Sequence, residues 1–156
     1  MFDFQTRYRV GKSNHLRYLS EEKGLYSKEE INHAEDAVKL MSEHLKIMDR
    51  EYCIVINLDN ANHPINFNVI SIGDTDHSLV PVKSIFKSAL LSNASRFIML
   101  HNHTGGTLKF SKEDQKVTER VIEAGKMMEL PLLDHIIVAG MSGECCSIRE
   151  KMPDLF

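Results

Sequence analysis

The sequence contains few cysteines, and none of them has the spacing typical of a disulfide framework or a metal motif. The three are Cys53, Cys145 and Cys146, an odd number with no Cys-x-x-Cys pair among them. Cys145 and Cys146 are too close along the chain for an easy bridge between their sulfurs. We therefore expect a cytoplasmic protein that works in a reducing environment.

The chain also lacks a long apolar run. No segment approaches the roughly 20 consecutive apolar residues that a membrane-spanning helix needs. The first 12 residues have neither the apolar core nor the small-residue cleavage site of a signal peptide. These absences argue against secretion and against insertion into a membrane.

Positive charge is not in excess. The chain has 19 Lys and Arg residues against 22 Asp and Glu residues, a net charge of -3 with histidine neutral. The basic residues are scattered, whereas a phosphate backbone is bound by basic residues gathered into a patch or stripe. Charge therefore gives no support to nucleic-acid binding.

The remaining composition is that of an ordinary soluble domain. Of the 156 residues, 42% are hydrophobic and 26% are charged, which excludes the disordered and collagen-like classes. A chain of this length buries roughly two thirds of its unfolded surface in one core, so no second domain is needed. We expect a domain at 27–150, an N-terminal extension at 1–26 in which residues 6–10 can pair as an edge strand, and a tail at 151–156.

Three segments have the three- and four-residue spacing of apolar side chains that is typical of helices. They are residues 28–46, 81–93 and 111–128. Ser27 and Glu30 have the spacing of a capping box before the first helix, and Ser111 and Asp114 repeat that spacing before the third.

Short β-branched or alternating segments predict the strands, and these segments are residues 52–59, 65–73, 96–100, 132–140 and 146–149. The first two are separated by a turn-rich segment and predict an antiparallel hairpin. The strand at 132–140 is the most apolar. The order of helices and strands predicts a three-layer α/β/α fold, with a mixed sheet covered by helices on both faces.

Two histidines, His101 and His103, directly follow the predicted strand 96–100. Residues two apart in extended backbone project to the same side, so both imidazoles can reach one ion while Asn102 turns away. A catalytic zinc ion usually takes three protein ligands and a water molecule. Asp114 is the candidate third ligand, because glycines in the intervening loop let the chain fold back.

These residues resemble the metal motif of the JAB/MPN (JAMM) metallopeptidases, E followed by H-x-H-x7-S-x-x-D. The matching residues are Glu51, His101, His103, Ser111 and Asp114. More narrowly, residues 100–140 resemble the RadC-type branch of that family, and the similarity extends from about residue 39 to residue 147. The resemblance implies the JAB/MPN architecture, which is like that of cytidine deaminases.

The resemblance also implies roles for single residues. His101, His103 and Asp114 would bind one zinc ion per chain. Glu51 would hold and deprotonate the metal-bound water, and the Ser111 hydroxyl would help to stabilise the tetrahedral oxyanion. Zinc lowers the pKa of its bound water to about 7 and polarises a carbonyl group, which suits amide hydrolysis. The implied activity is that of a metallopeptidase or isopeptidase acting on a peptide or protein substrate.

The chain departs from the RadC pattern after the second histidine. Thr104, Gly105 and Gly106 stand where a Pro-Ser-Gly usually follows, and residues 108–110 replace a Pro-rich turn. Every proposed ligand is kept. The changes bear on substrate preference and on the rigidity of the site, because pre-organisation depends on the supporting loop.

Simpler interpretations exist for the same residues. An isolated His-x-His is more often a pair of loop histidines, Ser111 with Asp114 is also a helix cap, and Glu51 lies in a charged turn. Asp134 interrupts an apolar strand and must be paired or hydrogen-bonded. The sequence leaves open whether Asp134 orients a histidine ligand or makes a purely structural hydrogen bond.

Two other functions are compatible with the resemblance. One is a DNA-associated accessory protein or nuclease of the RadC group, and the other is a non-catalytic interaction scaffold, since some JAB/MPN relatives lack the ligands. The intact ligand set favours the hydrolase, and the sequence leaves a homodimer open. A nucleophilic role for Cys53 is disfavoured, because this residue lies within an apolar strand, where a cysteine is usually a small buried hydrophobe.

Overall fold

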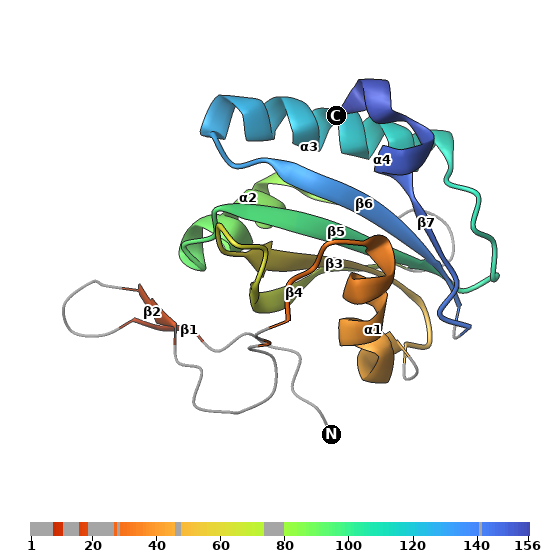
Figure 1. Ribbon diagram of the computed structural model, residues 1–156, viewed down its shortest axis with the longest axis horizontal. Coiled ribbons are helices and arrows are strands. Elements are labelled where there is room, and N and C mark those ends of the chain that lie inside the picture. The colour runs from red at the N-terminus through yellow and green to blue at the C-terminus, as the bar shows by residue number, and fades with distance from the viewer. Residues whose placement is uncertain are drawn as a thin grey trace.

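A computed structural model describes residues 8–10, 16–18, 27, 29–45, 48–73, 80–140 and 142–156. Its main feature is a five-stranded mixed sheet with helices on both faces (Figure 1), which confirms the predicted three-layer α/β fold. The strands of this sheet are β3 (Glu51–Leu58), β4 (Pro64–Gly73), β5 (Arg96–His103), β6 (Leu132–Ala139) and β7 (Cys145–Ser147). The helices are α1 (Ala34–Leu45), α2 (Val82–Leu91), α3 (Lys112–Met128) and α4 (Ile148–Lys151), followed by a 3-10 turn at Pro153–Leu155.

The strand order in the sheet is β4-β3-β5-β6-β7. Strands β3 and β4 form the predicted antiparallel hairpin, and β5 lies antiparallel to β3 on its other side. Strand β6 runs parallel to β5, and α3 connects the two. The chain therefore leaves the carboxyl end of β5 and passes through one loop directly into the first turn of α3.

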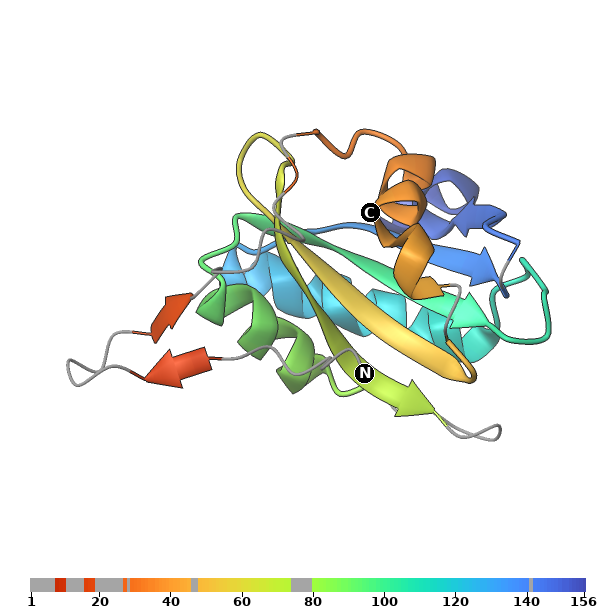
Figure 2. The same ribbon diagram turned by 90° about the horizontal axis from the view of Figure 1, so that it is seen from below.

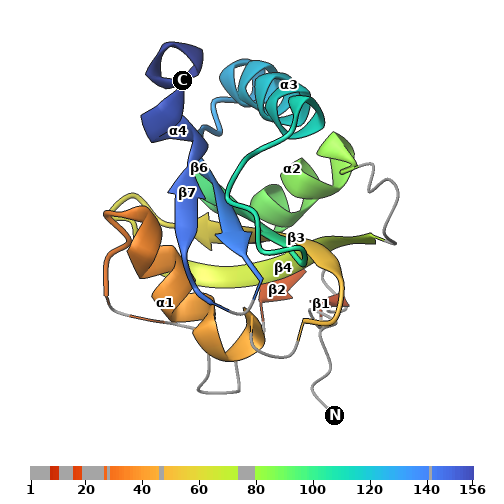
Figure 3. The same cartoon turned by 90° about the vertical axis from the view of Figure 1, so that its right-hand side faces the viewer.

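Helices lie on both faces of the sheet (Figure 2, Figure 3), and each face has its own apolar core. Helix α1 covers one face, where Val38, Met41, Leu45, Ile54, Ile56, Leu100 and Ile136 are buried. Helices α2 and α3 cover the other, where Val55, Ile85, Phe97, Met99, Val121 and Ile122 are buried. Full burial of one such side chain contributes about 1.5–3 kcal/mol, so the core beneath α2 and α3 holds α3 against β5 and β6.

Helix α1 begins later than the sequence predicts. The Ser27 hydroxyl accepts a hydrogen bond from the amide of Glu29 at 3.0 Å, so it closes a local turn and does not cap the helix. The carboxylate of Asp36 accepts from the amides of Asn32 and His33 at 3.0 and 2.9 Å. Asp36 thus binds the two amides just before the real start of the helix at Ala34, and the predicted beginning near residue 28 is wrong.

Two strand predictions also need correction. Strand β5 does not stop at Leu100 but continues to His103, because β6 pairs with it as far as Ala139. The last strand ends at Ser147, whose hydroxyl accepts from the amide of Glu150 at 3.0 Å and caps α4. Residues 148 and 149 are therefore helical instead of extended.

At the N-terminal end, β1 (Tyr8–Val10) pairs with β2 (Leu16–Tyr18) in a two-stranded antiparallel sheet of their own. The rest of the predicted extension at 1–26 lies outside the described residues. Within the described part of the chain, none of the helices has both the length and the apolar character that a membrane span requires.

Candidate metal centre

The alternation of side chains along β5 directs both histidines to the α3 face. Phe97 and Met99 are buried in the core on that face, and His101 and His103 continue the same alternation toward the end of the strand. Side-chain exposure is 12% for His101 and 10% for His103. Both histidines pair with β6, and His101 also pairs with β3, so they belong to the sheet and not to a loop.

The loop after His103 brings the start of α3 back to these histidines. The carbonyl oxygen of His103 accepts from the amide of Gly106 at 3.0 Å and from the amide of Gly140 at 2.8 Å. Gly106 has a φ of +73°, a conformation that residues with a side chain rarely adopt. The turn is thus anchored to the end of β6, although its sequence departs from the RadC pattern.

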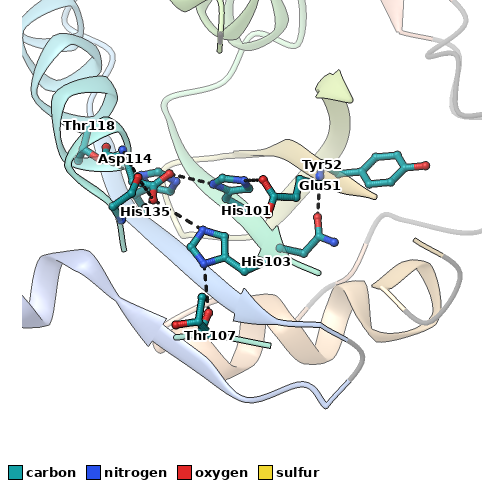
Figure 4. Close-up of polar contacts among 10 residues, drawn as sticks. Glu51, Tyr52, His101, His103, Thr107, Asp114, Thr118 and His135 are labelled. Carbon is teal, nitrogen blue, oxygen red and sulfur yellow. Dashed lines mark hydrogen bonds and ion pairs between the residues drawn. The ribbon is translucent and has the colours of Figure 1, made fainter. Parts of the chain in front are cut away.

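Asp114 faces both histidines and contacts each of them (Figure 4). Its Oδ1 is 3.1 Å from Nδ1 of His101, and its Oδ2 is 3.6 Å from Nε2 of His103. The imidazole rings of His101 and His103 meet edge to face, with centroids 4.9 Å apart. The three predicted ligands are therefore together, although 13 residues separate His101 from Asp114 along the chain.

The donor set fits a divalent metal ion. One nitrogen from each histidine and one carboxylate oxygen of Asp114 all lie within 4.8 Å of one another. Ligand atoms about 2.0–2.1 Å from a tetrahedral zinc ion would lie roughly 3.3 Å apart, so small side-chain adjustments suffice. Two imidazoles and a carboxylate are also the ligand types that zinc takes in hydrolytic sites.

His103 is held in an orientation suited to binding a metal. Its Nδ1 donates to the carbonyl oxygen of Thr107 at 3.1 Å, which leaves Nε2 directed at Asp114. Such a hydrogen bond to the other ring nitrogen commonly fixes the tautomer of a metal-binding histidine. The hydrogen bond to Asp114 raises the pKa of His103 above its ordinary value, against the lowering effect of burial.

Asp114 carries its negative charge throughout the ordinary pH range. Burial alone would raise the pKa of its carboxyl group, but hydrogen bonds from His101, His103 and Ser111 together hold that pKa well below the usual range. A permanently ionised carboxylate beside two imidazoles makes this group of residues attractive to a cation.

Ser111 and Asp114 form the capping box that the sequence predicts for α3. The Ser111 hydroxyl accepts from the amide of Asp114 at 3.0 Å and donates to Oδ2 of Asp114 at 2.7 Å. The amide of Ser111 also donates to that Oδ2 at 2.7 Å. One carboxylate therefore both stabilises the helix start and faces the histidines.

Glu51 lies on the other side of His101 from Asp114 (Figure 4). It is the first residue of β3, and its Oε2 is 3.7 Å from Nε2 of His101. Its side chain is 38% exposed, against 9% for Asp114. The carboxylate of Glu51 is thus at the open side of the centre, where a substrate or water molecule can reach it.

A comparison with known protein families agrees with this geometry. The model of the RadC-like JAB domain matches residues 31–153, which is most of the chain and includes all five motif residues. The chain belongs to the RadC-like JAB domain family. The resemblance inferred from the motif is therefore confirmed.

Similar proteins occur in bacteria and archaea. The domain is 35% identical over 121 residues to a UPF0758 protein of Caldanaerobacter subterraneus subsp. tengcongensis, covering 78% of this chain and 51% of the relative. It is 35% identical over 124 residues to a UPF0758 protein of Methanosarcina mazei, with shares of 80% and 53%. It is 37% identical over 126 residues to one of Shouchella clausii, with shares of 81% and 53%. The chain spans about half the length of these curated relatives, whose names state no activity.

In this RadC-like JAB domain, Asp134 makes a structural hydrogen bond and does not orient a histidine. Its Oδ1 accepts from the amide of Arg149 at 3.1 Å, and burial raises the pKa of its carboxyl group. A register shift between Phe97 and Ile98 leaves one extra residue in β6, so that Ile98 pairs with Asp134 and Met99 with His135. His135, not Asp134, consequently shares the α3 face with the ligands.

His135 and Thr118 are two residues of the centre that the sequence analysis missed. The Thr118 hydroxyl donates to the carbonyl oxygen of Asp114 at 2.6 Å, so it accepts from Nδ1 of His135 at 2.7 Å. The His135 ring stacks on that of His101, with centroids 6.3 Å apart. Burial, followed by the nearby His101, lowers the pKa of His135 to about 3, so its ring is neutral.

Two signals in the sequence pointed to this pair. His135 is a polar residue in the most apolar strand, and Thr118 lies one helical turn after Asp114. The Nε2 atom of His135 is buried without a hydrogen-bond partner in the described part of the chain. Through the Thr118 hydroxyl, which contacts both the Asp114 carbonyl oxygen and the His135 ring, these two residues connect the first turn of α3 to β6.

Proposed function

We propose that this RadC-like JAB domain is a zinc-dependent hydrolase of peptide or isopeptide bonds. The observation that carries the proposal is the convergence of His101, His103 and Asp114, whose ligand atoms lie within 4.8 Å of one another beside the partly exposed carboxylate of Glu51. When bound there, a zinc ion supplies a Lewis acid that lowers the pKa of water and polarises the carbonyl group of a substrate.

The three candidate ligands differ in how the protein holds them. His103 is fixed by Thr107 and presents Nε2, whereas Asp114 contributes a charged oxygen that is held by the capping box. His101 lies between the carboxylates of Asp114 and Glu51. The chain thus provides two imidazoles and one carboxylate as donors and keeps an open side toward Glu51.

Glu51 is the proton carrier of the proposed reaction. Its Oε2 takes a proton from the attacking water as the new carbon–oxygen bond forms, and it delivers that proton to the leaving nitrogen when the carbon–nitrogen bond then breaks. The 38% exposure of its side chain lets it face both the water and the leaving group. General acid–base transfer of this kind contributes about a hundredfold to ten-thousandfold to a rate.

Ser111 is suited to stabilise the oxyanion. Its hydroxyl donates to Asp114 in this structure, and it can turn to the substrate oxygen while the amide of Ser111 continues to hold Oδ2 of Asp114. Removing a single oxyanion donor typically costs about a hundredfold to a thousandfold in turnover.

The test compares zinc-loaded wild type with a Glu51→Gln variant on a mixed peptide library and on an isopeptide-linked lysine substrate. We expect both proteins to bind zinc and the variant to release amines at least about a hundredfold more slowly than the wild type, at a residual rate that can still be measured. Equal, background-level release by the two proteins on both substrate classes would overturn the proposal. Zinc-dependent cleavage of DNA in their place would favour the nuclease alternative.

A further inference from the structure

Asn102 stands between the two histidine ligands but faces away from them. Residues alternate along β5, so Asn102 projects to the α1 face together with Leu100, while His101 and His103 project to the α3 face. Asn102 is 2% exposed. A buried carboxamide has to find hydrogen-bond partners, because an unpaired one costs about 1–3 kcal/mol.

The partners of Asn102 are the two backbone groups on either side of Glu51. Its Oδ1 accepts from the amide of Tyr52 at 2.7 Å, and its Nδ2 donates to the carbonyl oxygen of Arg50 at 2.9 Å. In Figure 4 the backbone nitrogen of Tyr52 and the side chain of Glu51 lie next to each other at the start of β3. The carboxamide thus holds the chain before and after Glu51.

These two hydrogen bonds occur where the strand pairing ends. The register between β3 and β5 runs from Leu58 opposite Arg96 to Cys53 opposite His101, and it does not include Glu51. On the other side, β4 still pairs Glu51 with Gly73. From β5, the Asn102 side chain therefore supplies one acceptor and one donor to the backbone at the start of β3, as a peptide group of a longer ladder would do.

We propose that Asn102 is the positioning residue for Glu51, which fixes the distance between the proton-carrying carboxylate and the metal ligands. This inference rests on the role of Glu51 in the proposed function. Because Asn102 is bonded covalently to both histidines, its contacts tie the backbone of Glu51 to the strand that carries His101 and His103. The separation of 3.7 Å between Glu51 and His101 then depends on one short rigid segment.

Asparagine is suited to this task by its chemistry. The contact needs one acceptor for the amide of Tyr52 and one donor for the carbonyl oxygen of Arg50, at the reach of a single methylene group. Aspartate keeps the acceptor but has no donor when ionised, and alanine has neither. Asn102→Asp therefore removes one of the two attachments with almost no change in shape.

The experiment measures turnover and zinc affinity of Asn102→Asp and Asn102→Ala, alone and combined with Glu51→Gln. We expect kcat to fall about tenfold to a hundredfold with zinc affinity unchanged, since a misplacement of about 1 Å has an effect of that size. In the Glu51→Gln background, the same substitutions should have no further effect, because Asn102 acts through Glu51.

Asn57→Asp is the matched control. Asn57 is fully buried in the same β3 and donates to Asn66 and Ser88, at the opposite end of the strand from Glu51. We expect this variant to lose stability and to keep its turnover. A folded Asn102→Asp with wild-type kcat, or an equal loss of kcat with and without Glu51, would overturn the positioning role.

Amide hydrogen exchange tests the inference without any enzymatic activity. In the wild type we expect the amide of Tyr52 to be protected, and in Asn102→Ala to exchange at least about tenfold faster, as local opening at the end of a strand requires. An unprotected Tyr52 amide in the wild type would refute the contact itself. Protection that depends on Asn102, in a zinc-loaded wild type that cleaves nothing, would leave the anchoring intact and refute the proposed hydrolase instead.

Discussion

The carboxylate of Asp114 is shared between Ser111 and the histidines. Its Oδ2 accepts from both the amide and the hydroxyl of Ser111 at 2.7 Å, while its Oδ1 lies 3.1 Å from Nδ1 of His101. The helix cap and the candidate metal centre are therefore one structure. Folding of α3 places Asp114, the candidate third ligand, beside the histidines, and the Asp114 carboxylate in turn stabilises the start of α3.

Ser111→Ala separates these two roles. Loss of the capping hydroxyl should lower the free energy of unfolding by about 1 kcal/mol, measured by urea denaturation of the metal-free protein. Zinc stoichiometry should not change, because the amide of Ser111 still holds Asp114, whereas turnover should fall with the loss of the oxyanion donor. Ser147→Ala is the matched control, since Ser147 caps α4 in the same way. Ser147→Ala should lose similar stability and keep full turnover. A loss of turnover in Ser147→Ala would show that the loss of a helix cap is enough to lower activity, without any oxyanion role for Ser111.

Zinc affinity should depend on pH through His103. The pKa of His103 is raised above 6.5 by Asp114, so in the metal-free protein this ring is largely protonated below that raised pKa. The metal must displace the proton, and affinity should fall by about tenfold for each pH unit below it. Asp114 stays ionised over this range, so it does not contribute to the change of zinc affinity with pH. Calorimetry in buffers of different ionisation enthalpy measures the proton released.

His63→Gln serves as the control for that titration. His63 pairs with Asp59 in the turn between β3 and β4, away from the candidate centre. Its replacement should leave both zinc affinity and proton release unchanged. Affinity that is flat from pH 5 to pH 8 in the wild type would contradict the assignment of His103 as a ligand.

The stability of the protein should fall in mild acid because of His135. Burial lowers its pKa to about 3 in the folded state, whereas the unfolded chain takes up that proton near pH 6.5. The stabilisation is therefore complete above pH 6.5 and is lost as the pH falls toward 3, with a slope of about 1.4 kcal/mol per pH unit.

His135→Asn isolates this contribution. Asparagine keeps a donor for Thr118 and does not titrate, so the free energy of unfolding of this variant should vary less with pH between 6 and 4. Urea denaturation at several pH values gives the difference in slope. Identical slopes for the two proteins would mean that His135 is not a buried neutral ring.

The candidate metal centre shows most clearly which features can be predicted from the sequence and which cannot. The spacing of His101, His103 and Asp114 predicted three candidate ligands that β5, one loop and α3 bring together, because strand alternation and helix capping are local rules. The same rules could not separate Asp134 from His135. The extra residue in β6 moves His135 to the α3 face, and such a bulge depends on pairing with β5, which is not visible in the sequence.

The start of α1 was harder to predict, because two nearby groups of residues could each cap a helix. Ser27 with Glu30 and Asp36 with the amides before α1 are both plausible local caps, and only the second begins a helix. The amide of Ile31 donates to the carbonyl oxygen of Asn62 at 3.0 Å, so the segment before α1 is tied to the β3–β4 turn. That long-range contact favours extended backbone over an earlier helix start.

Cys53 should be inert in the folded protein. It is 2% exposed, and burial raises the pKa of its thiol to about 12. Cys145 and Cys146 are only partly buried, so a thiol reagent such as dithionitrobenzoate should modify them first. Cys53→Ala should keep zinc binding and turnover, measured in the assays above. Rapid labelling of Cys53 in native protein, or loss of turnover in Cys53→Ala, would revive a nucleophilic role.

The most direct test of the central claim is elemental analysis of gently purified protein beside a His103→Ala variant. The account predicts about one zinc ion per chain in the wild type and its loss in the variant, because three protein ligands are the usual minimum for a catalytic zinc site. A wild type that is purified without metal and takes up no added zinc would contradict it, and would favour a non-catalytic scaffold.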